Sequence, residues 1–199
     1  MSYHYGIAAL LAIPLSTAAL ADIVQMDSEY GAGSVTRDLD NGLDYLDLTQ
    51  TMGISYNDMV STHLASGGQY DGWRHATRAE YFALVASAGI VFNGSDPSPA
   101  DNVNTLINLL GQTFDSFGDG SLAQGITGTE NGTGSHIAQS IGFFRNFMTD
   151  EFEPASKSHT VQDHIASTEH GHFLVRAVPA PGSATMLAMT GLLAVRRRR

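Results

Sequence analysis

The sequence predicts a single α+β domain, from two strand-like segments and three helix starts that lie between them. Residues 43–48 and 172–178 alternate their side chains as partly buried strands do. The three helix starts between them each carry an N-terminal capping pattern. The resulting order of strand, three helices, loop and strand is that of an α+β fold.

The first strand-like segment is expected to form a β-hairpin with the residues before it. A short strand is predicted at residues 34–36. In the second arm, Leu43, Tyr45 and Asp47 alternate with Asp44, Leu46 and Leu48. Between the arms lies Asp40-Asn41-Gly42, which is a typical hairpin turn sequence.

The three helix starts share a hydroxyl side chain three residues before an acidic one. They are Ser55 with Asp58, Thr77 with Glu80, and Ser98 with Asp101. The hydroxyl accepts from free N–H groups at the helix start, and the acid favours the positive end of the helix dipole. The second and third helices each have an apolar face, and Gly111 is the expected stop of the third. These faces are Tyr81, Leu84, Val85 and Ala88 in one helix, and Val103, Leu106, Ile107 and Leu110 in the other.

The second half of the globular part is expected to be less regular. Residues 111–134 are glycine-rich and acidic, which predicts a long loop. A strand is expected at residues 140–148, entering the core through Phe143, Phe144 and Phe147. A second irregular stretch follows, before the last strand at residues 172–178.

The N-terminus has the features of a cleaved secretory signal. An apolar stretch at residues 7–17 precedes Ala19-Leu20-Ala21, a small-x-small pattern, directly before Asp22. The stretch is too short to span a bilayer. We therefore expect residues 1–21 to be a signal peptide that the Sec machinery recognises and signal peptidase removes.

The C-terminal tail combines three features in order. The proline motif Val178-Pro179-Ala180-Pro181-Gly182-Ser183 disfavours a helix, residues 184–195 carry no charge, and Arg196-Arg197-Arg198-Arg199 follow. The positive-inside rule keeps such arginines in the cytoplasm and places the preceding chain outside. A helix of about 12 residues covers roughly 18 Å of a hydrocarbon core of about 30 Å, which favours a transient membrane stop.

This order of features resembles the PEP-CTERM sorting signal, with Val-Pro-Ala-Pro where Val-Pro-Glu-Pro is commonest. The resemblance implies a bacterial envelope protein that is processed at residues 178–183 by an exosortase-type transpeptidase, in cells that make exopolysaccharide and biofilm. It divides the chain into a signal peptide (1–21), a globular domain (22–177) and a sorting signal (178–199). An ordinary tail anchor is the alternative.

The expected mature part is strongly acidic and contains no cysteine. All 20 Asp and Glu residues but only six of the ten Lys and Arg residues lie between Asp22 and Val178, which gives this part a formal net charge of −14. Such a surface repels nucleic acid and anionic lipid, so we expect neither as a partner, and contact with the membrane only through the unprocessed tail. Without cysteine, disulfides and thiolate chemistry are excluded.

The globular part also carries a block that resembles other domains. The block consists of residues 42–48, Ser55-Tyr56, residues 67–77 and Glu80, and the domain closes on Phe173-Leu174-Val175-Arg176. It is similar to a domain found in PEP-CTERM proteins and, more distantly, to the lectin-like C-terminal domain of bacterial collagen-like adhesins. This resemblance implies a C-type-lectin-like fold, in which the first and last strands pair and two helices follow the first strand.

Within this block, Gly72, Trp73, Arg74, Thr77 and Glu80 predict a structural corner. Glycine permits a tight turn, tryptophan buries a large area, arginine can bind carbonyls or an acid, and threonine caps the next helix. An exposed Trp73 that stacks on a sugar ring is the alternative interpretation.

Four histidines lie close together near the end of the domain, at His159, His164, His170 and His172. Imidazoles beside carboxylates can bind zinc or nickel, but the spacing of the first pair fits neither a helix nor a strand. We interpret this segment as a polar loop and expect no metal and no cofactor. Asp115 to Gly120 resembles a calcium loop only in part, because positions 3 and 12 lack ligands, and loose calcium binding by acidic loops is the alternative.

The sequence therefore favours an exported, non-enzymatic binding or adhesion module of the cell surface or exopolysaccharide matrix. No nucleophile-elbow or phosphate-binding motif is present. The alternative is a secreted hydrolase with a metal or carboxylate site in residues 159–172. A hydrolase would need His170 and His172 to face one pocket, whereas a binding module would present a shallow or flat acidic surface.

Overall fold

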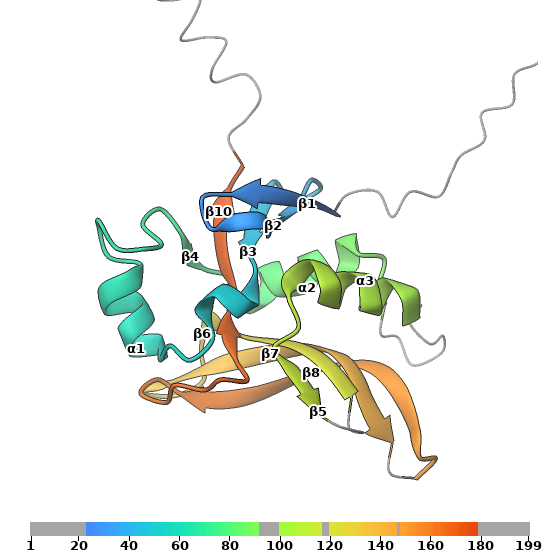
Figure 1. Ribbon diagram of the computed structural model, residues 1–199. Helices are drawn as coiled ribbons and strands as arrows, with labels where there is room; N and C mark the ends of the chain where they lie inside the picture. The colour runs from blue at the N-terminus through green and yellow to red at the C-terminus, as the bar shows by residue number, and fades with distance from the viewer. Residues whose placement is uncertain (1–22, 92–99, 117–119, 147, 179–199) are drawn as a thin grey trace, which may run out of the picture.

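The computed structural model describes residues 23–91, 100–116, 120–146 and 148–178, which form two mainly antiparallel sheets and three α-helices (Figure 1). Helices α2 and α3 lie between the two sheets. The α+β class is therefore confirmed. None of the helices within these ranges is long and apolar enough to cross a membrane.

The first sheet contains the predicted hairpin and residues 174–177 of the strand predicted at 172–178, whereas His172 belongs to the second sheet. Its order is β1-β2-β3-β10-β4. The strands are β1 (Ile23–Ser28), β2 (Gly31–Asp38), β3 (Leu43–Leu46), β10 (Leu174–Ala177) and β4 (Arg74–His75). The hairpin is confirmed, with β2 antiparallel to β3 and Gly42 at φ +63° in the turn. Strand β1 was not predicted.

The second sheet consists largely of segments that the sequence predicts as irregular. Its path is β5-β6-β7-β8, and β9 lies parallel to β6. The strands are β5 (Phe114–Ser116), β6 (Gly120–Glu130), β7 (Ser135–Asn146), β8 (Glu151–Gln162) and β9 (Gly171–His172). The strand expected at residues 140–148 is confirmed as part of β7, and Phe143 packs against the core. Phe147 lies outside the described residues.

The prediction of a long loop at residues 111–134 was wrong, because the glycines of β6 serve packing. A Cβ on Gly125 would lie 2.8 Å from both Leu48 and Phe173, so only glycine lets these side chains contact the strand. The glycine content that suggests a loop thus marks a strand that other elements approach closely.

The prediction of an irregular stretch after β7 was also wrong for residues 151–162. Strand β8 pairs with β7 along its whole length, from Ser135↔Gln162 to Asn146↔Glu151. It is polar because it lies at the end of the sheet path and is mostly exposed. Pairing with β7, rather than apolar periodicity, forms this strand.

The first two helices begin where the capping patterns predict. Ser55 caps α1 (Tyr56–Asp58), which continues into the π-helical turn η2 (Met59–His63). Thr77 and Glu80 form a complete capping box at α2 (Arg78–Ser87). Helix α3 (Ala100–Leu110) ends before Gly111, which has φ +84°. The expected cap at Ser98 lies outside the described residues.

The core has two parts, one on each face of the first sheet. The larger part contains Tyr45 and Val175 of neighbouring strands and the predicted apolar faces of α2 and α3. The smaller part contains Leu46, Met59, Trp73 and Leu174. A 3₁₀ turn, η1 (Leu48–Thr51), leads from β3 towards the second sheet. The centre of the first sheet is therefore buried on both faces, whereas the edge strand β1 is mostly exposed.

Candidate functional site

The candidate site lies at the turn between β6 and β7, next to α1. The antiparallel register places Glu130 opposite His136, and β8 ends beside the start of β7, which brings Asp163 to the same place. The Asp163 N–H donates to the Gly134 carbonyl at 3.0 Å. Residues from two strand ends and one loop thus meet because of sheet pairing.

His136 and Asp163 form a buried pair at this site. The ring Nδ1 lies 2.7 Å from the carboxylate Oδ1, and the two side chains are only 8% and 14% exposed. Because a carboxylate accepts, Nδ1 carries the proton in the neutral ring. The other ring nitrogen, Nε2, makes no hydrogen bond to the described part of the chain. The pair fixes the ring and leaves Nε2 able to bind a ligand.

Tyr56 stacks between two histidine rings. Its ring centroid lies 3.6 Å from that of His136, with a 17° interplanar angle, and 4.5 Å from that of His75. The capped start of α1 positions Tyr56, and the Asn57 N–H donates to the Asp163 carbonyl at 3.0 Å. Burial raises the pKa of Tyr56, and the charges of Asp163 and Glu130 add to this. Tyr56 is therefore a neutral phenol that holds His136 in place.

His75 continues this row of rings into the core. His172 Nε2 lies 2.9 Å from the Ile54 carbonyl, so Nε2 carries the proton and His172 Nδ1 accepts from His75 Nε2 at 2.9 Å. Burial lowers the pKa of His75 to about 3 and that of His172 to about 4. Both rings are neutral and act as structural groups.

The four histidines of residues 159–172 do not converge. His159 and His170 face each other, with 2.7 Å between their Nε2 atoms, while His172 is fully buried and hydrogen-bonded elsewhere. His164 is exposed. Burial lowers the pKa of His159, and burial together with His159 lowers that of His170 to about 4. Within the described ranges, no group of three His, Asp or Glu side chains is arranged to hold a metal ion.

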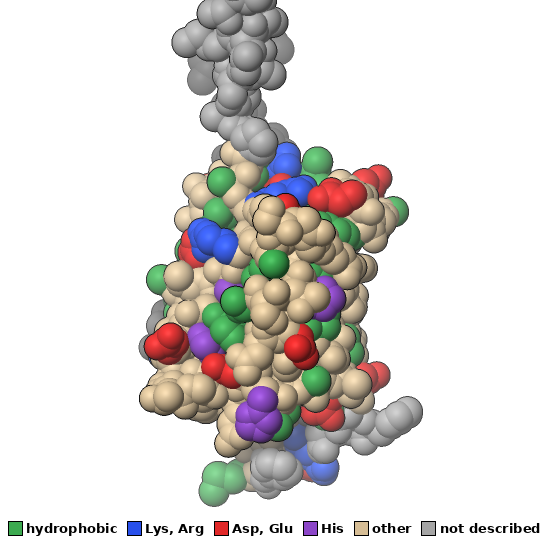
Figure 2. All heavy atoms as spheres, turned by 90° about the vertical axis from the view of Figure 1, so that its left-hand side faces the viewer, with side chains coloured by type: hydrophobic (Ala, Val, Ile, Leu, Met, Phe, Trp, Pro, Cys, Tyr) green, Lys and Arg blue, Asp and Glu red, His purple; other side chains and the backbone are tan. Residues whose placement is uncertain are grey.

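An open cleft of about 370 Å³ lies beside the pair of His136 and Asp163. Its lining consists of Glu130, Gly132, Thr133, Gly134, His136 and Asp163. On the face of the molecule that carries α1, histidine and acidic side chains lie among uncharged ones, and Lys and Arg lie towards the ends (Figure 2). A much smaller cavity, of about 50 Å³, lies between β1, α2 and α3 and contains no titratable side chain.

The corner at residues 72–80 is built from structural contacts, although the buried Nε1 of Trp73 has no hydrogen-bond partner among the described residues. Gly72 has φ +86°, and Trp73 is only 5% exposed. The Arg74 guanidinium donates to both Glu80 oxygens, at 2.9 and 2.6 Å, while Thr77 caps α2. Arg74, with help from Thr77, lowers the pKa of Glu80 to about 2. Because Trp73 is buried, its face is not available to stack on a sugar ring.

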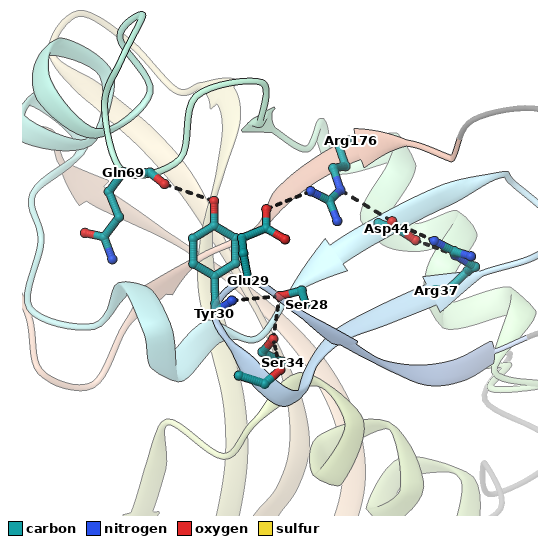
Figure 3. A network of polar contacts seen from close by, with 9 residues as sticks. Ser28, Glu29, Tyr30, Ser34, Arg37, Asp44, Gln69 and Arg176 are labelled. Atoms are coloured by element: carbon teal, nitrogen blue, oxygen red, sulfur yellow. Dashed lines mark hydrogen bonds and ion pairs between the residues drawn. The ribbon is translucent and has the colours of Figure 1, made fainter. Parts of the chain in front are cut away.

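Arg176 covers the face of Trp73 and belongs to a polar network on the first sheet (Figure 3). It contacts Glu29 at 3.0 Å and Asp44 at 3.4 Å, and Asp44 also binds Arg37. The Tyr30 hydroxyl donates to the Gln69 carbonyl at 2.9 Å. This network fastens the turn between β1 and β2 onto β10 and the loop before β4.

The predicted processing sites lie mostly beyond the described ranges. Ala19, Ala21, Asp22, residues 179–183 and residues 196–199 fall outside them. Val178 lies inside, and its N–H donates to the Gly42 carbonyl at 2.9 Å. The partial calcium loop has Asp115 in β5 and Gly120 in β6, and residues 117–119 are outside the described ranges.

The sequence analysis did not bring the residues of the candidate site together. His136 and Asp163 of the cleft, and Tyr56 and His75 that stack behind His136, are far apart in the chain and meet only through sheet pairing and the position of α1. One local signal was available, because Asn131-Gly132 is a strong hairpin turn sequence and would have placed His136 near the start of a strand.

Comparison with known proteins gives no relative for this chain: no family model, no curated protein and no solved structure matches it.

Proposed function

We propose that the chain is an exported bacterial protein of the cell surface or exopolysaccharide matrix, and that it acts as a non-enzymatic binding or adhesion module. On this proposal, signal peptidase removes residues 1–21. An exosortase-type transpeptidase then sorts the protein through the Val178–Ser183 motif and the terminal arginines. The globular domain has a C-type-lectin-like fold.

The observation that carries the choice of a binding module is the dispersal of the histidines. A hydrolase built on residues 159–172 needs His170 and His172 to share a pocket, but they point to different partners, and both have a lowered pKa. The face shown in Figure 2 instead carries scattered acidic and histidine side chains among uncharged ones, and an open cleft lies at one end of the second sheet. Open, polar surfaces suit recognition of a hydrated polymer.

The arrangement of the first sheet supports the lectin-like proposal. Strand β3 pairs antiparallel with β10, so a strand near the start of the domain is joined to one at its end. Helices α2 and α3 follow β3 and pack on the core face that Tyr45 and Val175 share. This pairing and the two helices agree with what the resemblance to adhesin domains implies, whereas β1 and β2 precede the paired strand.

Intact mass of the protein recovered from the envelope and medium of the producing cells tests the sorting proposal. We expect loss of the residues before Asp22 and of the tail after about Val178. Replacing Arg196 to Arg199 with serine should cause mis-sorting, whereas replacing them with lysine, which keeps the charge, should not. A recovered protein that retains Arg196 to Arg199 would mean a plain anchor and would refute the exosortase assignment.

A further inference from the structure

The cleft between the β6–β7 turn and the loop after β8 has the composition of a ligand site. Its volume of about 370 Å³ lies within the range of about 300–1,000 Å³ that small-molecule sites occupy. Its floor is the buried pair of His136 and Asp163, and its rim is the exposed Glu130 and the backbone of residues 132–134. We propose that this cleft binds an amino-sugar unit of a cationic polysaccharide.

The charge of the cleft selects for a cation. Two of its six lining residues are acidic, and none of the six is Lys or Arg. Glu130 is exposed at the rim, where an ammonium group can reach it with little rearrangement. A charge-assisted hydrogen bond to a carboxylate is about twice as strong as a neutral one. The acidic domain as a whole also attracts a polycation and repels a uronic-acid polymer.

The floor of the cleft supplies a fixed group for sugar hydroxyls. Asp163 holds the His136 ring through Nδ1, and Tyr56 stacks on its face at 3.6 Å. The ring therefore loses little freedom on binding, and Nε2 remains to accept from a hydroxyl. A hydroxyl beside an ammonium group is the pattern that a glucosamine unit presents.

The glycines of the turn leave the rim open. An added Cβ on Gly134 would meet no atom within 4 Å, and one on Gly132 would meet only the Ser135 hydroxyl, at 3.8 Å. The backbone at both positions is exposed. A sugar ring can therefore approach the backbone closely, as it could not past larger side chains.

This inference rests on the proposed function, since it names the polymer class that the binding module takes. Titration calorimetry with the purified full-length chain tests it, using a glucosamine hexamer as the probe and its N-acetylated form as the matched control. We expect the glucosamine hexamer to bind at least tenfold more tightly, and its affinity to fall as salt is raised.

Two variants separate the cleft from general charge attraction. Glu130→Gln should weaken binding of the glucosamine hexamer at least fivefold. Glu153→Gln makes the same charge change near the far end of β8 and should leave the affinity within twofold. Equal losses in the two variants, no loss with Glu130→Gln, or equal binding of the two hexamers would each overturn the inference.

A further measurement keeps this inference distinguishable from the proposed function. Binding to matrix polysaccharide extracted from the producing cells would be compared for the unaltered chain and Glu130→Gln. Binding that survives the substitution would leave the adhesion role standing and refute this site. Binding of neither the hexamers nor the extracted polysaccharide would refute both.

Discussion

Replacing Asp44 with asparagine should destabilise the protein strongly, because this carboxylate joins three strands. The register places Asp44 of β3 directly opposite Arg37 of β2 and Arg176 of β10 (Figure 3). Arg37 donates to its two oxygens at 2.7 and 3.0 Å, and Arg176 donates at 3.4 Å. The Asp44 side chain is 1% exposed, while the arginines are 25% and 33% exposed.

The expected cost follows from these contacts. Asparagine keeps one acceptor oxygen but turns an N–H₂ group towards a guanidinium, so one or two charge-assisted hydrogen bonds are lost. Each contributes about 1.5–3 kcal/mol, and removing one partner of a buried pair costs about 3–5 kcal/mol. Because both arginines are partly exposed and regain water, we expect the free energy of unfolding to fall by about 2–4 kcal/mol.

Urea denaturation of the full-length chain measures this change from the transition midpoint. A double-mutant cycle with Arg37→Met should show a coupling energy above about 1 kcal/mol between the two positions. Glu153→Gln, an exposed change of the same charge, serves as the control and should have an effect within about 0.5 kcal/mol. A loss below 1 kcal/mol for Asp44→Asn would refute the view that the three strands depend on this carboxylate.

Three further predictions concern Glu80, His172 and Gly171. Glu80 has a pKa of about 2 in the folded protein, below the value of about 4.5 in the unfolded chain. Its ion pair therefore stabilises the fold fully at pH values above about 4.5, and this contribution is lost as the pH falls to about 2. Thermal unfolding against pH should therefore be flatter in this window for Glu80→Gln, and an unchanged profile would contradict the role of the ion pair. His172 has a pKa of about 4, so the unfolded chain binds more protons between pH 6.5 and 4 and stability should fall on acidification. Urea titrations at several pH values should show a smaller loss of stability on acidification for His172→Gln than for the unaltered chain. An equal loss would contradict the role of His172. Gly171→Ala places a Cβ 2.2 Å from the Leu48 carbonyl oxygen and should lower the free energy of unfolding by about 1–3 kcal/mol. A urea midpoint equal to that of the unaltered chain would contradict this.

Local patterns in the sequence were sufficient for much of the first sheet and for the helices. The turn at Asp40-Asn41-Gly42 and the caps at Ser55 and Thr77 depend on hydrogen bonds within a few residues. The apolar faces of α2 and α3 follow from helical periodicity. Such features can be predicted from the sequence because the interacting groups are neighbours in the chain.

The second sheet could not be predicted in this way. Glycine in β6 satisfies packing against Leu48 and Phe173, which are distant in sequence, and polar β8 is a strand because β7 supplies its partners. Propensity describes only the local preference, and here tertiary contacts override it. The same contacts explain why residues 111–134 and 151–162 were predicted as irregular.

The sequence by itself determined the α+β class, the acidic charge and the terminal segments on which the proposed export depends. Only the tertiary structure decided which polar residues meet. It buried His172 among hydrogen-bond partners, gave His170 a different partner in His159, and brought His136 to Asp163 beside a cleft. The physical reason is that strand pairing and loop closure, rather than spacing along the chain, set the distances between side chains from different elements.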